Sequence, residues 1–178
     1  MSDPAGLTAR IFFALWPDAA LRARLLEAQG RLHDNFGGRR MRPDTLHLTL
    51  LFVGAWPCEG LDELVQRAGE IRFPPLGLSL NRAECWPHNR IVSLVATDTD
   101  PAIAGLVGEL KARVHALGGV CERRPFTPHV TLLRHAQCGE PAPAIVPIHW
   151  TAQEFVLVES RLSSRGPDYR TLARWSAE

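Results

Sequence analysis

The chain has 178 residues, 46% of them hydrophobic and 22% charged, with a formal net charge of +1. This length and composition fit one globular domain that can bury a core without staples. No apolar run approaches the roughly 20 residues needed to cross a bilayer. The small net charge excludes a dedicated duplex binder, which needs a broad basic surface for phosphates.

The start of the chain and its cysteines bear on the cellular compartment. Residues 1–6 have neither the basic nor the apolar region of an export signal. The four cysteines form no C-x-x-C pair, and we interpret them as free thiols of a reducing compartment. They are Cys58, Cys85, Cys121 and Cys138. We therefore expect a cytoplasmic protein without a membrane partner.

The first half of the chain predicts alternating strands and helices. Apolar, β-prone residues predict strands over 10–16, 46–53 and 76–86. Asp18 is a typical N-cap for a helix that carries leucines at helical spacing after it. A second helix is predicted over 60–71.

The second half repeats much of this order. Strands are predicted over 91–97, 129–134 and 153–162, with a short one near 170–175. A helix begins at Pro101, which suits a first helical turn. The proline-containing stretch 139–147 is expected to be a connecting loop.

Two tetrapeptides stand out: His47-Leu48-Thr49-Leu50 and His129-Val130-Thr131-Leu132. On a strand, the histidine and threonine of each motif share one face, because the side-chain period is two. His47 follows Pro17 by 30 residues, and His129 follows Pro101 by 28. Matching motifs at matching spacing predict an internal duplication, with approximate repeats 8–88 and 89–175, that brings both pairs together.

The paired residues suit acid–base chemistry at phosphorus. One histidine can donate a proton to a leaving oxygen while the other takes a proton from the attacking group. Two threonine hydroxyls can donate hydrogen bonds to non-bridging phosphate oxygens. The set contains no nucleophile, so water or a substrate hydroxyl must attack.

Other interpretations of these residues are weaker. A single His-x-Thr would be an ordinary strand pair, but its duplication favours function. Two histidines are too few for a tetrahedral zinc site, and the spacings typical of histidine ligands are absent, so we expect no metal. The chain also lacks a G-x-S-x-G elbow and the glycine motifs of nucleotide-binding loops.

One arginine, five aromatic residues and five further histidines are additional candidates for the site. Arg134 could bind a phosphate. Strict alternation from His129 places it on the opposite face of the strand, so a bulge, a twist or its long side chain would have to bring the guanidinium to the site. Five aromatic residues that could stack a base are interpreted as core: Phe12, Phe13, Trp16, Phe52 and Trp86. The remaining histidines have no partner motif: His33, His88, His115, His135 and His149.

The two tetrapeptides resemble the paired signature of the two-histidine (2H) phosphoesterase superfamily. Nearly the whole chain is similar to one branch, the RNA 2′,3′-cyclic phosphodiesterases, also called 2′–5′ RNA ligases. The similarity covers the Phe-Phe-Ala strand at 12–15, Leu-His-Leu-Thr-Leu-x-Phe-x-Gly at 46–54 and Phe-x-Pro-His-x-Thr-Leu-x-Arg at 126–134. It continues through 158–160 and the Gly-x-x-Tyr-x-x-Leu-x-x-Trp pattern at 166–175.

The resemblance implies a single α+β domain over 1–178, with two pseudo-twofold lobes, two antiparallel-rich sheets flanked by helices, and a cleft between the lobes. It also implies cofactor-free and metal-independent opening of a ribose 2′,3′-cyclic phosphate to a 2′-phosphomonoester. The implied substrate is RNA with such ends, and reversible 2′–5′ ligation is possible by the same resemblance. We expect a monomer.

The resemblance also implies roles for five residues. His129 activates water and His47 protonates the departing 3′ oxygen, although a pseudo-symmetric site permits the reverse. Thr49 and Thr131 hold the non-bridging oxygens, and Arg134 contacts the phosphate. Two alternative functions stay open: a nucleotide-binding module without useful turnover, and a phosphodiesterase for small cyclic nucleotides.

Overall fold

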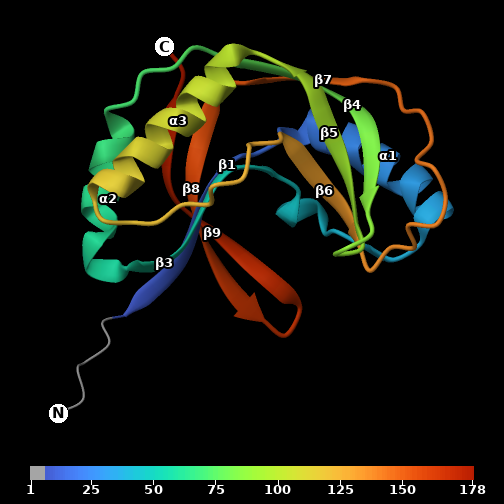
Figure 1. The fold of residues 1–178 in the computed structure, drawn as a ribbon, viewed down its shortest axis with the longest axis horizontal. Coiled ribbons are helices and arrows are strands. Elements are labelled where there is room, and N and C mark those ends of the chain that lie inside the picture. Colours follow the sequence, from blue (N-terminus) through green and yellow to red (C-terminus); the bar gives the residue numbers. More distant parts are fainter. Residues whose placement is uncertain (1–6) are drawn as a thin grey trace.

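The computed structural model describes residues 7–178, so the first six residues, on which the expected lack of an export signal rests, lie outside it. The described part combines helices with a large sheet (Figure 1). The helices are α1 (Ala19–Phe36), α2 (Leu61–Gly69) and α3 (Pro101–Ala116), with short 3-10 turns at Pro43–Thr45 and Cys58–Gly60. The strands are β1 (Thr8–Leu15), β2 (Arg39–Arg40), β3 (Leu48–Pro57), β4 (Leu76–Trp86), β5 (Ile91–Thr99), β6 (His129–Arg134), β7 (Ile148–Ala152), β8 (Glu154–Ser163) and β9 (Gly166–Ser176).

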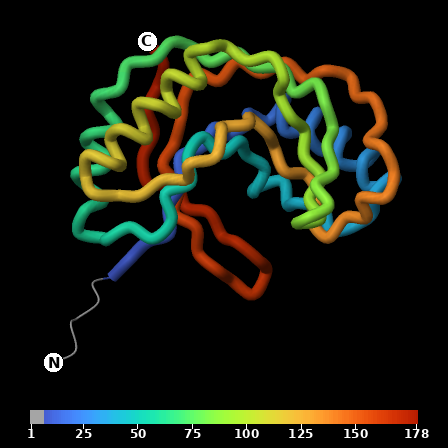
Figure 2. Tube along the Cα trace, in the orientation of Figure 1, coloured from blue at the N-terminus to red at the C-terminus, as the bar shows by residue number. Residues whose placement is uncertain are grey.

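The strands form one continuous sheet in the order β7-β4-β5-β6-β3-β1-β8-β9, with β2 beside β6. Every pairing in it is antiparallel. The sheet curls into an open half-barrel around a concave side (Figure 2). The predicted α+β class is confirmed. The expected two sheets are joined into one, because Leu48 of β3 pairs with Val130 of β6.

The two halves of the sheet draw strands from both ends of the chain. β4 lies with β5, β6 and β7, whereas β8 and β9 lie with β1 and β3. Each half therefore contains strands from both predicted repeats, and the duplication stays a prediction. The helices also cross over: α1 follows β1 but contacts β6 and β7, and α3 follows β5 but contacts β3.

Local chemistry explains where these elements begin. The Asp18 side chain accepts a hydrogen bond from the Leu21 amide at 2.7 Å, and the Asp100 side chain accepts one from the Ala102 amide at 2.8 Å. Both aspartates thus cap a helix, as predicted for Asp18. Gly38 has a φ of +85°, and a Cβ there would lie 2.6 Å from a β6 carbonyl oxygen. Only glycine lets β2 pair so closely with β6.

The cysteine prediction is wrong for one pair. Cys85 is the penultimate residue of β4 and Cys138 follows β6, and the two form a disulfide across a sequence separation of 53 residues. The contact depends on the strand order, which places β4 and β6 on either side of β5, and no local spacing reveals it. Cys58 and Cys121 are free. The compartment argument from four free thiols therefore no longer holds.

None of the helices in residues 7–178 is long and apolar enough to cross a membrane.

Candidate active site

The two His-x-Thr motifs meet at the seam between the halves of the sheet. The pairing of Leu48 with Val130 is antiparallel, so its register sets His47 opposite Thr131 and Thr49 opposite His129. The residues that flank a pair of opposite residues, on both strands, point to the same face of the sheet. All four line one cleft of about 580 Å³, so the structure brings the predicted pairs together.

Both imidazoles are held in the same way. The Nδ1 of His47 lies 2.7 Å from the carbonyl oxygen of Thr45, and the Nδ1 of His129 lies 2.7 Å from that of Thr127. A carbonyl only accepts, so each Nδ1 carries a proton and each Nε2 is left for chemistry. The Nε2 of His47 is 3.0 Å from the Thr49 hydroxyl.

A β-bulge places Arg134 in the cleft. In the β5–β6 pairing, Ser93 is opposite Thr131 and Val92 is opposite Leu133, so Leu132 is skipped. The skipped residue reverses the alternation beyond it and returns Arg134 to the face of the histidine. Arg134 lines the cleft.

The other motif strand has a bulge at the same offset. The β1–β3 register skips Leu50, because Ala14 is opposite Thr49 and Phe13 is opposite Leu51. Phe52 thereby reaches the cleft, five residues after His47, as Arg134 does five residues after His129.

His47 is surrounded by aromatic rings. The ring centroids of Phe12, Tyr169 and Trp16 lie 5.0, 5.3 and 5.5 Å from that of His47. Burial lowers the pKa of His47 to about 4, against the raising effect of its bond to the Thr45 carbonyl. The charges of His129 and Arg134 contribute to this lowering. His47 is thus neutral at pH 7 in the free protein.

His129 has a more balanced environment. Its ring packs edge-on against Trp86 at a centroid distance of 4.9 Å. The Trp86 indole donates a hydrogen bond of 2.8 Å to the Glu84 carboxylate. Burial lowers the pKa of His129, while its bond to the Thr127 carbonyl and the charge of Glu84 raise it. A carboxylate thus favours the protonated form of this histidine alone.

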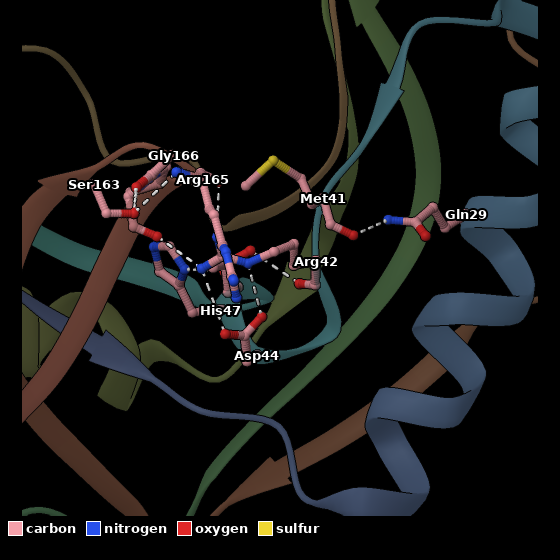
Figure 3. A network of polar contacts seen from close by, with 10 residues as sticks. Gln29, Met41, Arg42, Asp44, His47, Ser163, Arg165 and Gly166 are labelled. Carbon is pink, nitrogen blue, oxygen red and sulfur yellow. Dashed lines mark hydrogen bonds and ion pairs between the residues drawn. The ribbon is translucent and has the colours of Figure 1, made fainter.

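A polar network supports the segment before His47 (Figure 3). Arg42 donates hydrogen bonds to the carbonyl oxygens of Arg165 (2.9 Å) and Pro167 (2.8 Å) at the tip of the β8–β9 hairpin. It also pairs with Asp44 at 3.1 Å. The Thr45 hydroxyl donates to the Arg42 carbonyl at 2.9 Å. The carbonyl that orients His47 is therefore tied to a distant hairpin.

A buried glutamine reinforces the seam. The Gln29 amide nitrogen of α1 donates to the carbonyl oxygens of Met41 (2.9 Å) and Leu132 (3.0 Å). Gln29 is only 4% exposed, so these bonds are shielded from water. They connect the chain leading to His47 with the strand that carries His129.

Sequence reasoning misplaced some aromatic residues and missed other groups. The core interpretation is confirmed for Phe13 but wrong for Phe52, which is 40% exposed in the cleft. Trp86 also lines the cleft. Glu84 was missed, and Tyr169 was noted only as part of the pattern at 166–175, without a place in the site. Alternation on β4 and β9 offered no sign that either residue would approach a motif histidine.

One histidine outside the two motifs lies at the cleft. Of the histidines without a partner motif, His88 lines the cleft. Within residues 7–178 there is no group of three or more His, Cys, Asp or Glu side chains placed to hold a metal ion. A second cavity, of about 480 Å³ between α1 and residues 143–148, contains none of the predicted site residues.

The chain is similar to several known proteins along most of its length. Residues 15–97 match the family described as LigT like Phosphoesterase. A protein of Escherichia coli (strain K12) named RNA 2′,3′-cyclic phosphodiesterase is 32% identical over 180 residues, covering 99% of this chain and 98% of its own. A Thermus thermophilus protein of the same name is 29% identical over 186 residues, covering 94% and 89%. The crystal structure of E. coli LigT complexed with 3′-AMP has a TM-score of 0.88 at 30% identity, covering 96% and 99%.

The full-length match at 32% identity shows that the chain belongs to the LigT-like phosphoesterases of the 2H superfamily. The resemblance noted in the sequence is thereby confirmed.

Proposed function

We propose that the chain hydrolyses the 2′,3′-cyclic phosphate at the end of an RNA to a 2′-phosphomonoester, without a metal ion. The observation that carries this proposal is the arrangement of two imidazoles with available Nε2 atoms and two threonine hydroxyls around one paired position. Relatives that align with nearly the whole chain bear the name of this activity.

The reaction uses both histidines in one displacement. The neutral Nε2 of His129 takes a proton from water as the water oxygen attacks phosphorus. The bond between phosphorus and the 3′ oxygen breaks, and the protonated Nε2 of His47 gives that oxygen its proton. Water is consumed, the phosphate stays on the 2′ oxygen, and the two histidines have exchanged protonation states.

The surroundings of each histidine favour this assignment of roles. The Glu84 charge stabilises the imidazolium that forms at His129 when it accepts a proton. The burial of His47 and the nearby positive charges make its imidazolium unfavourable, so it readily releases a proton. Both proton transfers thus lead from a less populated form, with His47 protonated and His129 neutral, to the protonation state that the surroundings favour.

The remaining site residues bind the reacting phosphate. The hydroxyls of Thr49 and Thr131 donate hydrogen bonds to its non-bridging oxygens, where charge increases in the transition state. The Arg134 guanidinium balances the negative charge from the same face of β6.

The experiment uses an oligoribonucleotide ending in a 2′,3′-cyclic phosphate, incubated with the purified protein in excess chelator. The expected product is the 2′-phosphate, identified by its phosphorus NMR signal against authentic 2′- and 3′-phosphate standards. A 3′-phosphate product, or loss of turnover on chelation, would contradict the proposal. Tight binding without turnover would instead favour a nucleotide-binding module.

A further inference from the structure

We propose that the RNA strand upstream of the cyclic phosphate lies along a basic strip formed by Arg39 and Arg165, next to Arg134 in the cleft. This inference rests on the proposed function and extends its substrate from a terminal nucleotide to a strand of several nucleotides. The strip, as used below, means these two arginines outside the cleft.

The strip begins beside the phosphate-binding arginine. Arg39 of β2 pairs directly with Arg134 of β6. Cross-strand partners present their side chains on the same face of a sheet, so both guanidinium groups lie on the side of the cleft. A phosphate bound at Arg134 therefore has the Arg39 guanidinium, on the neighbouring strand β2, as a second cationic group nearby.

The strip continues to the tip of the β8–β9 hairpin. A Cβ on Gly166 would lie 4.0 Å from the Nη1 of Arg39, so the Arg39 guanidinium reaches the hairpin tip. Arg165 precedes Gly166 in the turn and is exposed. Figures 1 and 2 show this hairpin projecting away from the body of the sheet. The two bonds from Arg42 hold the tip in place.

The hairpin also continues the wall of the cleft. Ser160 and Tyr169 are register partners and both line the cleft. Alternation puts Leu162 on the same face, nearer the tip, where it is 91% exposed. An exposed apolar side chain between the cleft and a basic tip offers a surface for a nucleobase, as single-strand binding sites do.

The charges of the strip and of the adjacent Arg134 are not neutralised within the described chain. Among residues 7–178, no carboxylate oxygen lies within 4.0 Å of the side-chain nitrogens of Arg39, Arg134 or Arg165, whereas Arg42 pairs with Asp44 and Arg161 pairs with Glu159. Guanidinium groups suit phosphodiesters because they donate paired hydrogen bonds. A cyclic mononucleotide has no upstream phosphodiester, so it leaves this strip unused.

The kinetic test compares adenosine 2′,3′-cyclic phosphate with a six-nucleotide RNA carrying the same end. The unmodified protein should have the higher kcat/KM for the RNA. The relevant quantity is kcat/KM for the RNA divided by kcat/KM for the mononucleotide. Arg39→Ala and Arg165→Ala should each lower this ratio by up to about fivefold, the usual range for an exposed charge pair. Arg39→Lys should keep most of the preference. Arg170→Ala is the matched control, because Arg170 lies on the opposite face of the same hairpin and should leave the ratio unchanged.

A binding measurement makes the test independent of turnover. The probe is the same six-nucleotide RNA with a 2′-phosphate and a fluorescent 5′ label, followed by anisotropy at several salt concentrations. Each alanine variant should reduce the slope of log affinity against log salt by about 0.7, the value for one lost single-strand phosphate contact.

The outcomes separate the two proposals. Equal losses on both substrates, or unchanged slopes in both alanine variants, would overturn the basic strip while leaving the hydrolysis in place. If the unmodified protein cleaves neither substrate but the variants lower the RNA-binding slope, the strip stands and the proposed hydrolysis fails.

Discussion

In the free protein, the hydroxyl of Thr49 lies 3.0 Å from the Nε2 of His47. Because the His47 Nδ1 donates to the Thr45 carbonyl, the neutral Nε2 accepts and the hydroxyl donates. The same hydroxyl is the proposed donor to a phosphate oxygen. Substrate binding therefore takes this hydroxyl from His47 and frees its Nε2 for proton transfer.

Replacing this hydroxyl tests the coupling. Thr49→Ala should lower kcat by about 10²-fold, the usual cost of removing an oxyanion donor. Thr49→Ser should keep most of the rate, because it retains the hydroxyl. Thr151→Ala, an exposed change on β7, is the control and should be neutral. Steady-state rates on a cyclic phosphate RNA measure all three, and a fully active Thr49→Ala protein would refute the oxyanion role.

The pH dependence should reflect the lowered pKa of each histidine. Both groups favour the neutral form in the free protein, and the reaction needs one of them protonated. We therefore expect kcat/KM to peak below about pH 6.5, the usual histidine pKa, and to fall as pH rises. A bound phosphate anion favours both imidazolium forms, so the kcat profile should lie at higher pH. Both profiles report the coupled pair. A common optimum above pH 7 would contradict this expectation.

Glu84 should shift this profile through its charge. Glu84→Gln keeps an acceptor for the Trp86 indole but removes the charge that raises the pKa of His129. The alkaline limb of kcat/KM, which follows the histidine of higher pKa, should move to lower pH, and kcat should fall because the imidazolium at His129 loses support. Glu63→Gln, on the exposed side of α2, is the matched control. An identical profile for the two variants would exclude Glu84 from this role.

The same burial predicts an acid sensitivity of the fold. The pKa of His47 is about 4 in the folded protein and about 6.5 when unfolded. The unfolded state therefore binds the proton first, and stability falls as pH drops from about 6.5 to 4. His47→Gln should remove roughly 2 kcal/mol of the loss between pH 7 and pH 4.5. Urea unfolding at pH 7 and pH 4.5 measures it, with the exposed His149→Gln as control; parallel losses in both variants would contradict the prediction.

Short-range patterns predicted the elements that carry the chemistry. The apolar alternation around His129 placed its strand at 129–134, where the structure has it. The cap at Asp18 and the helix start at Pro101 followed from residue type alone. These features depend on neighbours within a few residues, so a single sequence contains them.

Features that depend on strand pairing could not be predicted. The bulges at Leu50 and Leu132 decide which way Phe52 and Arg134 point, and a bulge is a property of two strands together. The strand order likewise brings the β8–β9 hairpin and Tyr169 to the site from the far end of the chain. Distant contacts of this kind leave no periodic trace in either segment.

A substrate with sulfur in place of the bridging 3′ oxygen tests the central claim, that His47 and His129 have distinct acid and base roles. A thiol has a pKa of about 8.5 and leaves without a proton donor. On the natural substrate, both His47→Ala and His129→Ala should lose about 10²-fold or more in rate. On the sulfur substrate, His47→Ala should approach the rate of the unmodified protein, while His129→Ala should stay slow. Recovery of His129→Ala, or of neither variant, would contradict the account.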